Sequence, residues 1–238
     1  MKTPLVTELK QDKELFDPER FAALVQQCGS VPKAFRQAMK EADAVLERRF
    51  LSMENIKLII RRRAWTMDQL LKQLWNQFAC ANCTDIALLA VGGYGRAELH
   101  PHSDIDLLIL LRDRQQAERF RSDLETFVTQ LWDVGLEVGH SVRSVDECAD
   151  LAKADITIAT NLMESRTIAG NAELGEMMLQ VTGPDRIWPP REFFMAKWTE
   201  QIARHNKHAN TEYNLEPDIK SAPGGLRDIQ TIGWVAKR

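Results

Sequence analysis

The chain has 238 residues, of which 44% are hydrophobic and 27% are charged, and its formal net charge is −3. This is the composition of an ordinary globular protein, and the small net charge gives no general attraction to nucleic acid. The first residues lack the apolar core of a signal peptide, and no apolar run reaches the ~18 residues of a membrane span. We therefore expect a cytoplasmic protein that binds neither a membrane nor nucleic acid.

The first third of the chain predicts helices. Apolar residues recur at helical spacing within residues 1–50, and Asp17-Pro18-Glu19 is a typical helix start. A longer helix is expected over residues 52–78. The chain has four cysteines, and the Cys80-x-x-Cys83 pair lacks a second ligand pair at a spacing that suits zinc. We interpret all four as small buried or partly exposed thiols.

The middle of the chain changes to strands. Two short aliphatic runs, residues 85–91 and 104–111, are separated by a turn-rich segment, and residues 136–142 form a third strand candidate. The remaining segments predict helices: 115–132, one that starts at the capping box Ser144–Glu147, 155–165, 172–181, 191–209 and 227–238.

These elements predict an α+β fold, with a small mixed sheet flanked by helices and helical segments at both ends of the chain. Their order is too irregular for a doubly wound nucleotide-binding fold. We divide the sequence into a helical N-terminal segment (1–50), a core that would carry the chemistry (51–165) and a helical region that follows it (166–238).

Residues 91–110, VGGYGRAELHPHSDIDLLIL, have the pattern of a chemical site. In a strand, Asp104 and Asp106 point to the same face, while Ile105 and Leu107 point to the core. Two adjacent carboxylates repel each other, and a divalent cation between them removes that cost. Carboxylate oxygens suit Mg²⁺, which commonly takes its remaining ligands from the phosphates of a substrate.

The glycines of this stretch complete the predicted site. Without side chains, Gly92 and Gly93 let backbone N–H groups approach phosphate oxygens closely. Ser103 adds a hydroxyl directly before the first aspartate. A dinucleotide-binding glycine pattern would lead from a strand into a long helix, whereas this one leads to a second strand.

A strand, Gly-Gly, a spacer and then Asp-x-Asp within a second strand resembles the DNA polymerase β-like nucleotidyltransferase superfamily. Members of that superfamily carry a third carboxylate on a later strand. Glu137, in Leu136-Glu137-Val138, matches that position best, and Asp155 is a weaker substitute.

The resemblance implies the polymerase β-like nucleotidyltransferase fold and a set of site residues. It implies that Asp104, Asp106 and Glu137 are catalytic and bind Mg²⁺, with Mn²⁺ as an alternative. It also implies nucleotide contacts from four residues of the glycine segment: Gly92, Gly93, Ser103 and Arg96.

Four blocks narrow the resemblance to the family of bacterial PII uridylyltransferase/uridylyl-removing enzymes, over its N-terminal nucleotidyltransferase region. They are VGGYGRAELHPHSDIDLLIL, LEVGHSVRSVDE, ATNLMESRTIAG and YNLEPDIKSAPGGLRDIQTIGWVAKR, within residues 85–238. The resemblance implies transfer of UMP from UTP to a tyrosine hydroxyl of the PII nitrogen-signalling protein, with release of pyrophosphate. UTP and PII are thus the expected partners.

Two departures and two alternatives accompany this expectation. Ala97 stands where the family usually has glycine, and the sequence ends before the HD hydrolase and ACT sensor domains of the family. An adenylyltransferase of the same superfamily is one alternative. A non-catalytic nucleotide-binding regulatory module is the other, and the intact Asp104/Asp106 pair argues against it.

Overall fold

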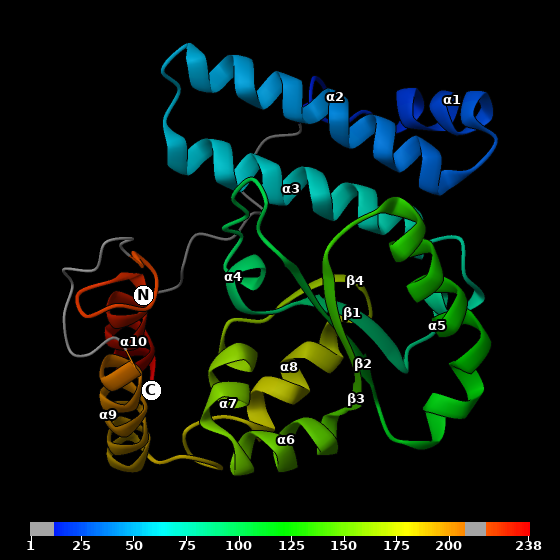
Figure 1. Cartoon of the computed structure of the whole chain (residues 1–238). Coiled ribbons are helices and arrows are strands. Elements are labelled where there is room, and N and C mark those ends of the chain that lie inside the picture. Colours follow the sequence, from blue (N-terminus) through cyan, green and yellow to red (C-terminus); the bar gives the residue numbers. More distant parts are fainter. Residues whose placement is uncertain (1–11, 208–217) are drawn as a thin grey trace. The chain divides into compact units, whose positions relative to one another are not determined.

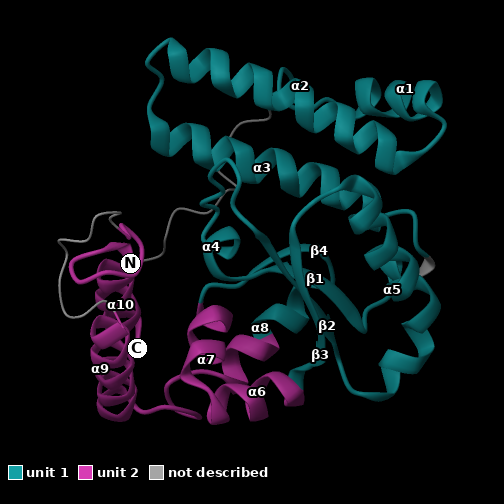
Figure 2. Ribbon diagram, viewed as in Figure 1, with its two compact units in different colours: residues 1–145, 164–176 teal, residues 146–163, 177–238 magenta. Residues whose placement is uncertain are grey.

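The structure is a computed structural model that describes residues 12–207 and 218–238. It contains two compact units (Figure 2). The first comprises residues 1–145 and 164–176, and the second comprises residues 146–163 and 177–238. The sheet and the helices up to residue 134 belong to the first unit. The division into segments 1–50, 51–165 and 166–238 stays a prediction about sequence organisation.

Three helices open the first unit (Figure 1): α1 Pro18–Cys28, α2 Val31–Leu51 and α3 Ile56–Trp75. The carboxylate of Asp17 accepts hydrogen bonds from the backbone N–H groups of Glu19 and Arg20, so the predicted helix start is confirmed. The helix expected over residues 52–78 is shorter at both ends. Asn55 caps its N-terminus, and the residues before Asn55 form the turn after α2.

The turn between α2 and α3 contains a residue in the left-handed conformation, Met53, with φ of 66°. The N–H of Met53 donates to the carbonyl of Phe50, and the N–H of Glu54 donates to the carbonyl of Arg49. These two bonds form a Schellman motif, in which glycine is the usual left-handed residue. The Met53 side chain is 90% exposed, so its burial does not offset the conformational cost.

We expect Met53→Gly to raise the free energy of unfolding by about 0.5–1 kcal/mol. The relieved left-handed strain, roughly 1–2 kcal/mol, exceeds the roughly 0.4–1 kcal/mol of unfolded-state entropy that glycine adds. Denaturant titration measures the difference. Met53→Ala keeps the strain and is the matched control, so a gain of equal size from alanine would contradict this account.

Four strands form one mixed sheet in the order β3-β2-β1-β4. They are β1 Ile86–Ala90, β2 Ile105–Leu111, β3 Val138–Ser144 and β4 Arg166–Gly170. β1 lies antiparallel to β2 and to β4, and β2 lies parallel to β3. The expected α+β fold with a small mixed sheet is confirmed, whereas β4 was not predicted as a strand.

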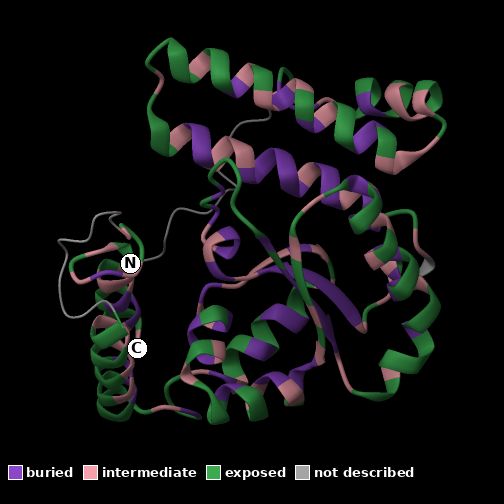
Figure 3. Cartoon of the chain, viewed as in Figure 1, coloured by how far each residue is buried: buried purple, intermediate pink, exposed green. Residues whose placement is uncertain are grey.

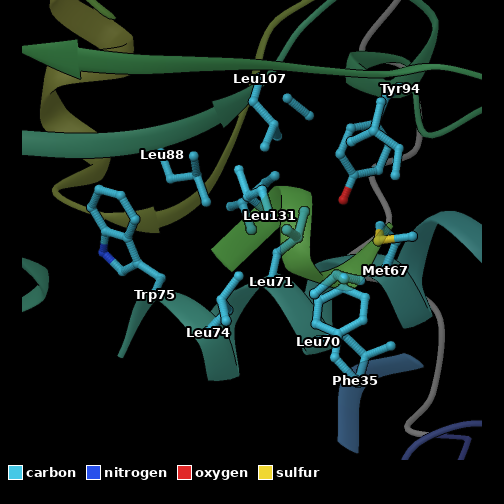
Figure 4. Close-up of a cluster of buried hydrophobic side chains, with 14 of the residues drawn as sticks. Phe35, Met67, Leu70, Leu71, Leu74, Trp75, Leu88, Tyr94, Leu107 and Leu131 are labelled. Atoms are coloured by element: carbon cyan, nitrogen blue, oxygen red, sulfur yellow. The ribbon is translucent and has the colours of Figure 1, made fainter. Parts of the chain in front are cut away.

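One face of this sheet packs on a helical core formed with α3 and α5 (Gln115–Val134). Figure 4 shows Leu88 of β1 and Leu107 of β2 beside Leu71 and Leu74 of α3. Much of α3 is buried (Figure 3), and Trp75 meets the ring of Phe127 edge-on at 5.1 Å between centroids. This packing fixes the place where β1 ends and β2 begins.

The second unit is helical within its described residues. Its helices are α6 Val145–Ala154, α7 Ile156–Met163, the C-terminal part of α8 Ala172–Val181, α9 Pro190–Lys207 and α10 Leu226–Lys237. The first residue of α6, Val145, still belongs to the first unit. The Arg238 guanidinium donates to the backbone carbonyls of Thr182 and Trp188. The helices expected in these regions are confirmed, except that positions 208 and 209 lie outside the described residues.

None of the four cysteines, all of which lie in the described residues, forms a disulfide; Cys80 and Cys148 are buried, and Cys28 and Cys83 are partly exposed, as expected. Among the described helices, none is both long enough and apolar enough to cross a bilayer.

Candidate functional site

The two aspartates lie where β2 begins. Asp104 directly precedes the strand and Asp106 is its second residue; both side chains are exposed, whereas Ile105 and Leu107 between and after them are buried. The backbone carbonyl of Asp106 accepts a hydrogen bond from Val91 N–H at the end of β1, 3.0 Å away. The carboxylates thus lie on the face opposite the core, at the end of the sheet where β1 ends and β2 begins. We call this end of the sheet the aspartate edge.

Glu137 reaches the same edge from the neighbouring strand. The parallel register pairs Ile105 with Val138, so Asp104 and Glu137 both directly precede a paired residue. Ile105 N–H donates to the Glu137 carbonyl at 3.0 Å. Glu137 was expected within the strand, but β3 begins one residue later because the chain leaves α5 through the left-handed Gly135.

The carboxylates do not form a ready three-ligand cluster. Within residues 12–207 and 218–238, no group of three His, Cys, Asp or Glu side chains is arranged to hold a metal ion. The weaker candidate Asp155 lies in the second unit, where its carboxylate accepts from Thr157 N–H and caps α7. The donor set that the sheet edge offers is therefore a pair of aspartates, with Glu137 beside it.

Gly139 of β3 makes room for Asp106. The register pairs these two residues, and a Cβ atom at position 139 would lie 2.6 Å from Asp106 Oδ1. A side chain there would therefore displace the carboxylate. No local sequence signal indicates this role of Gly139, because it comes from the parallel pairing of β2 and β3, which α5 separates in the chain.

The glycine segment after β1 forms a helical turn, α4 Gly92–Gly95, where only a loop was expected. Gly92 has φ of 59°, a left-handed conformation that glycine adopts without strain. Position 93 is open, since the nearest atom to a Cβ there would be Arg96 Nη2 at 3.6 Å. Ser103 is exposed directly before Asp104. These residues flank the start of β2.

Arg96 was predicted to contact the nucleotide, but its guanidinium faces carboxylates of the protein. Nε donates to Glu98 at 2.9 Å and Nη1 donates to the buried Glu164 at 2.5 Å. Gly95 lies against the same partner, because a Cβ atom there would be 1.7 Å from the Glu164 carbonyl oxygen. Both contacts fasten the glycine turn to the segment that leads into β4.

A buried cluster of three side chains, Asp68, Tyr94 and Arg166, also holds the glycine turn in place. The Tyr94 hydroxyl donates to Asp68 Oδ1 at 2.6 Å, and Arg166 donates to both Asp68 oxygens at 2.5 and 3.0 Å. Arg166 also donates to the Tyr94 carbonyl at 3.3 Å. Burial, together with the Asp68 carboxylate, raises the pKa of Tyr94 well above its usual value, so this hydroxyl stays a donor. Figure 4 shows Tyr94 next to Met67 of α3.

Ala97 has φ of 60°, so the position does require the left-handed conformation that glycine would adopt freely. The Ala97 methyl group is buried, however, with only 5% of the residue exposed. Burial of one such carbon contributes about 0.8 kcal/mol, and the smaller unfolded-state entropy of alanine adds about 0.4–1 kcal/mol. Together these offset most of the roughly 1–2 kcal/mol of strain. Alanine is therefore tolerated here.

Two family models match parts of the chain. The family model of a putative nucleotidyltransferase, DUF294, matches residues 33–142, which contain most of α2, all of α3 and the aspartate edge. Residues 33–142 are therefore similar to a nucleotidyltransferase family, and they include β1 and β2 of the mixed sheet. A second model, GlnD PII-uridylyltransferase, matches residues 192–238.

Curated relatives are similar over nearly the whole chain. Enzymes named bifunctional uridylyltransferase/uridylyl-removing enzyme are 57% identical in Pseudomonas fluorescens (strain Pf-5), 56% in Pseudomonas putida (strain W619) and 56% in Stutzerimonas stutzeri (strain A1501). Each match covers 95% of this chain and 25% of the relative. The chain is therefore a homologue of the bifunctional uridylyltransferase/uridylyl-removing enzymes and spans about a quarter of their length.

Proposed function

We propose that the chain carries the nucleotide-transfer site of a PII uridylyltransferase. In this reaction a tyrosine hydroxyl of PII attacks the α-phosphorus of UTP. A new P–O bond to tyrosine forms, the bond to the leaving pyrophosphate breaks, and the hydroxyl proton is released. The observation that supports this most is the exposed Asp104/Asp106 pair at the start of β2, where the Asp106 carbonyl accepts a hydrogen bond from Val91 N–H just before the glycine turn, in a chain homologous to named uridylyltransferases.

The carboxylates fit a divalent cation. Two oxygen donors face one side of the sheet edge, and the missing side chain of Gly139 leaves room beside Asp106. Mg²⁺ takes such oxygens together with substrate phosphates, and Mn²⁺ suits the same ligands. Bound there, the cation would supply charge neutralisation on the triphosphate. We assign Asp104 and Asp106 to hold it, and leave Glu137 two roles: a further ligand, or the base that accepts the tyrosine proton.

The glycine turn would position the triphosphate. The backbone N–H groups of Gly92 and Gly93, with the Ser103 hydroxyl, are donors without bulky side chains and suit phosphate oxygens. Because Arg96 already donates to Glu98 and Glu164, we assign it to holding the turn in place rather than to the nucleotide. Catalysis would then come mainly from alignment and charge neutralisation.

Incubation with labelled nucleotide tests the proposal and its alternatives. The chain is mixed with purified PII, Mg²⁺ and either α-labelled UTP or α-labelled ATP, and label on PII is measured. Label from UTP supports uridylyl transfer, and label from ATP alone would instead identify an adenylyltransferase. Nucleotide binding without any transfer would favour a regulatory module. Location in the cytoplasm belongs to the same proposal.

A further inference from the structure

A groove runs between the α2–α3 helix pair and the segment that leads into β2. It consists of two cavities, of about 490 and 470 Å³, whose walls share Asp43, Arg63, Leu99 and His102. Every residue in these walls belongs to the first unit. Cavities of this size accommodate a small ligand or a few side chains of a bound segment.

The half nearer the sheet is lined by three cations, Arg36, Lys40 and Arg63, and by two carboxylates, Asp43 and Glu137; we call it the cationic half. Arg36 and Lys40, one helical turn apart on α2, both line this cavity and are exposed. Like charges at this spacing repel each other. Among the described residues, no ion pair to a carboxylate is formed by either side chain. A carboxylate placed between them would relieve the repulsion.

The far half is mainly apolar, although the exposed Glu47 also lines it. Its walls carry five aliphatic or aromatic side chains from the ends of α2 and α3: Leu46, Phe50, Ile56, Ile59 and Ile60. Phe50 is 54% exposed and Ile56 is 50% exposed, so the cavity offers apolar surface to a ligand. The ion pair between Arg63 and Asp43 lies where the two halves meet.

The cationic half ends at the candidate catalytic edge. Ser103, Ile105 and Glu137 line it, and these residues flank Asp104 in the chain and in the sheet. Because side chains alternate along a strand, Ile105 faces the groove while Asp106 faces the other side of the sheet. An in-line displacement needs the nucleophile and the leaving group on opposite sides of the phosphorus. The groove reaches the aspartate edge from the face opposite Asp106, and this direction of approach suits an incoming acceptor hydroxyl.

We propose that this groove docks an extended segment of the acceptor protein. The segment would place a carboxylate between Arg36 and Lys40 and an apolar side chain against Phe50 and Ile56, with the acceptor hydroxyl directed to the edge at Glu137. The exposed cations Arg36 and Lys40 and the apolar side chains of the far half favour a peptide that carries a carboxylate and an apolar side chain over a nucleotide. This inference rests on the proposed function for the identity of the acceptor.

Charge reversal and an apolar truncation test the docking groove. The double variant Arg36→Glu/Lys40→Glu is compared with Lys33→Glu, an exposed lysine of α2 outside the groove. Phe50→Ser is compared with Leu51→Ser, the neighbouring exposed residue that does not line it. Calorimetry gives the Kd of PII with UTP omitted and, separately, the Kd of UTP. Thermal unfolding confirms that each variant is folded.

We expect the double variant to raise the Kd of PII at least tenfold and Phe50→Ser to raise it severalfold. The Kd of UTP and both control variants should stay at wild-type values. Equal PII affinity in all variants, or no PII binding by the wild-type chain, would overturn the docking proposal. A weaker affinity for UTP in the double variant would also overturn the proposal, because it would show that the nucleotide occupies the groove. The Kd of PII is measured with UTP omitted, so it does not depend on catalysis. Absence of uridylyl transfer would therefore count only against the proposed function.

Discussion

Asp106→Asn is expected to lower the rate of uridylyl transfer to PII by about a thousandfold, a loss of about 4 kcal/mol of transition-state stabilisation. Asparagine has nearly the same shape but lacks the negative charge that would hold a divalent cation against the triphosphate. Because Asp106 is exposed at the sheet edge, the stability of the chain should hardly change. The measurement is transfer of α-labelled UMP under saturating UTP, with thermal unfolding as the control.

Gly139→Ala, on the neighbouring strand β3, tests whether the position of the Asp106 carboxylate matters for activity. The new Cβ atom would lie 2.6 Å from Asp106 Oδ1, so the end of that flexible side chain must move. We expect kcat/KM to fall at least tenfold while the unfolding temperature stays close to that of the wild type. Val142→Ala on the same strand is the matched control. Full activity of a folded Gly139→Ala protein, or of Asp106→Asn, would contradict the placement of the site.

Asp68→Ala is expected to be among the most destabilising single changes, with a loss of about 3–5 kcal/mol in the free energy of unfolding. It leaves the guanidinium of Arg166, whose side chain is only 11% exposed, without its carboxylate. It also removes the acceptor of the Tyr94 hydroxyl. Denaturant titration measures the loss.

The exposed pair of Glu118 and Arg121 provides the control for this change. Glu118→Ala should leave stability almost unchanged, because exposed ion pairs contribute little. A small effect of Asp68→Ala would show that the cluster does not hold the glycine turn. If instead the variant is destabilised as expected, its residual activity at low temperature should also fall, since Tyr94 lies within that turn.

Much of the fold could be predicted from local sequence signals. Asp17 and Pro18 mark the start of α1, and the aliphatic runs mark β1 and β2, because caps and apolar periodicity act within a few residues. β4 escaped prediction because Arg166–Gly170 is short and begins with an arginine. That arginine is turned toward buried Asp68, 98 positions earlier, and no local pattern indicates such a partner.

The candidate site shows the same limit. The i, i+2 spacing predicts that Asp104 and Asp106 share one face, and both are exposed while Ile105 between them is buried. The φ of Ala97 agrees with the expectation that this position favours glycine. The partner of Arg96 and the role of Gly139 depend on which strands pair and in which register. Those facts come from tertiary packing, so the local sequence did not indicate that the Arg96 guanidinium donates to Glu98 and Glu164.

The affinity for UTP, measured with and without Mg²⁺ in the wild-type chain and in Asp106→Asn, tests most directly whether the aspartate edge binds a nucleotide through a divalent cation. Isothermal titration calorimetry in the presence of excess EDTA gives the metal-free value. We predict that Mg²⁺ tightens UTP binding at least tenfold in the wild type and has little effect in the variant. An equal effect of Mg²⁺ on both proteins, or no effect on either, would contradict the account.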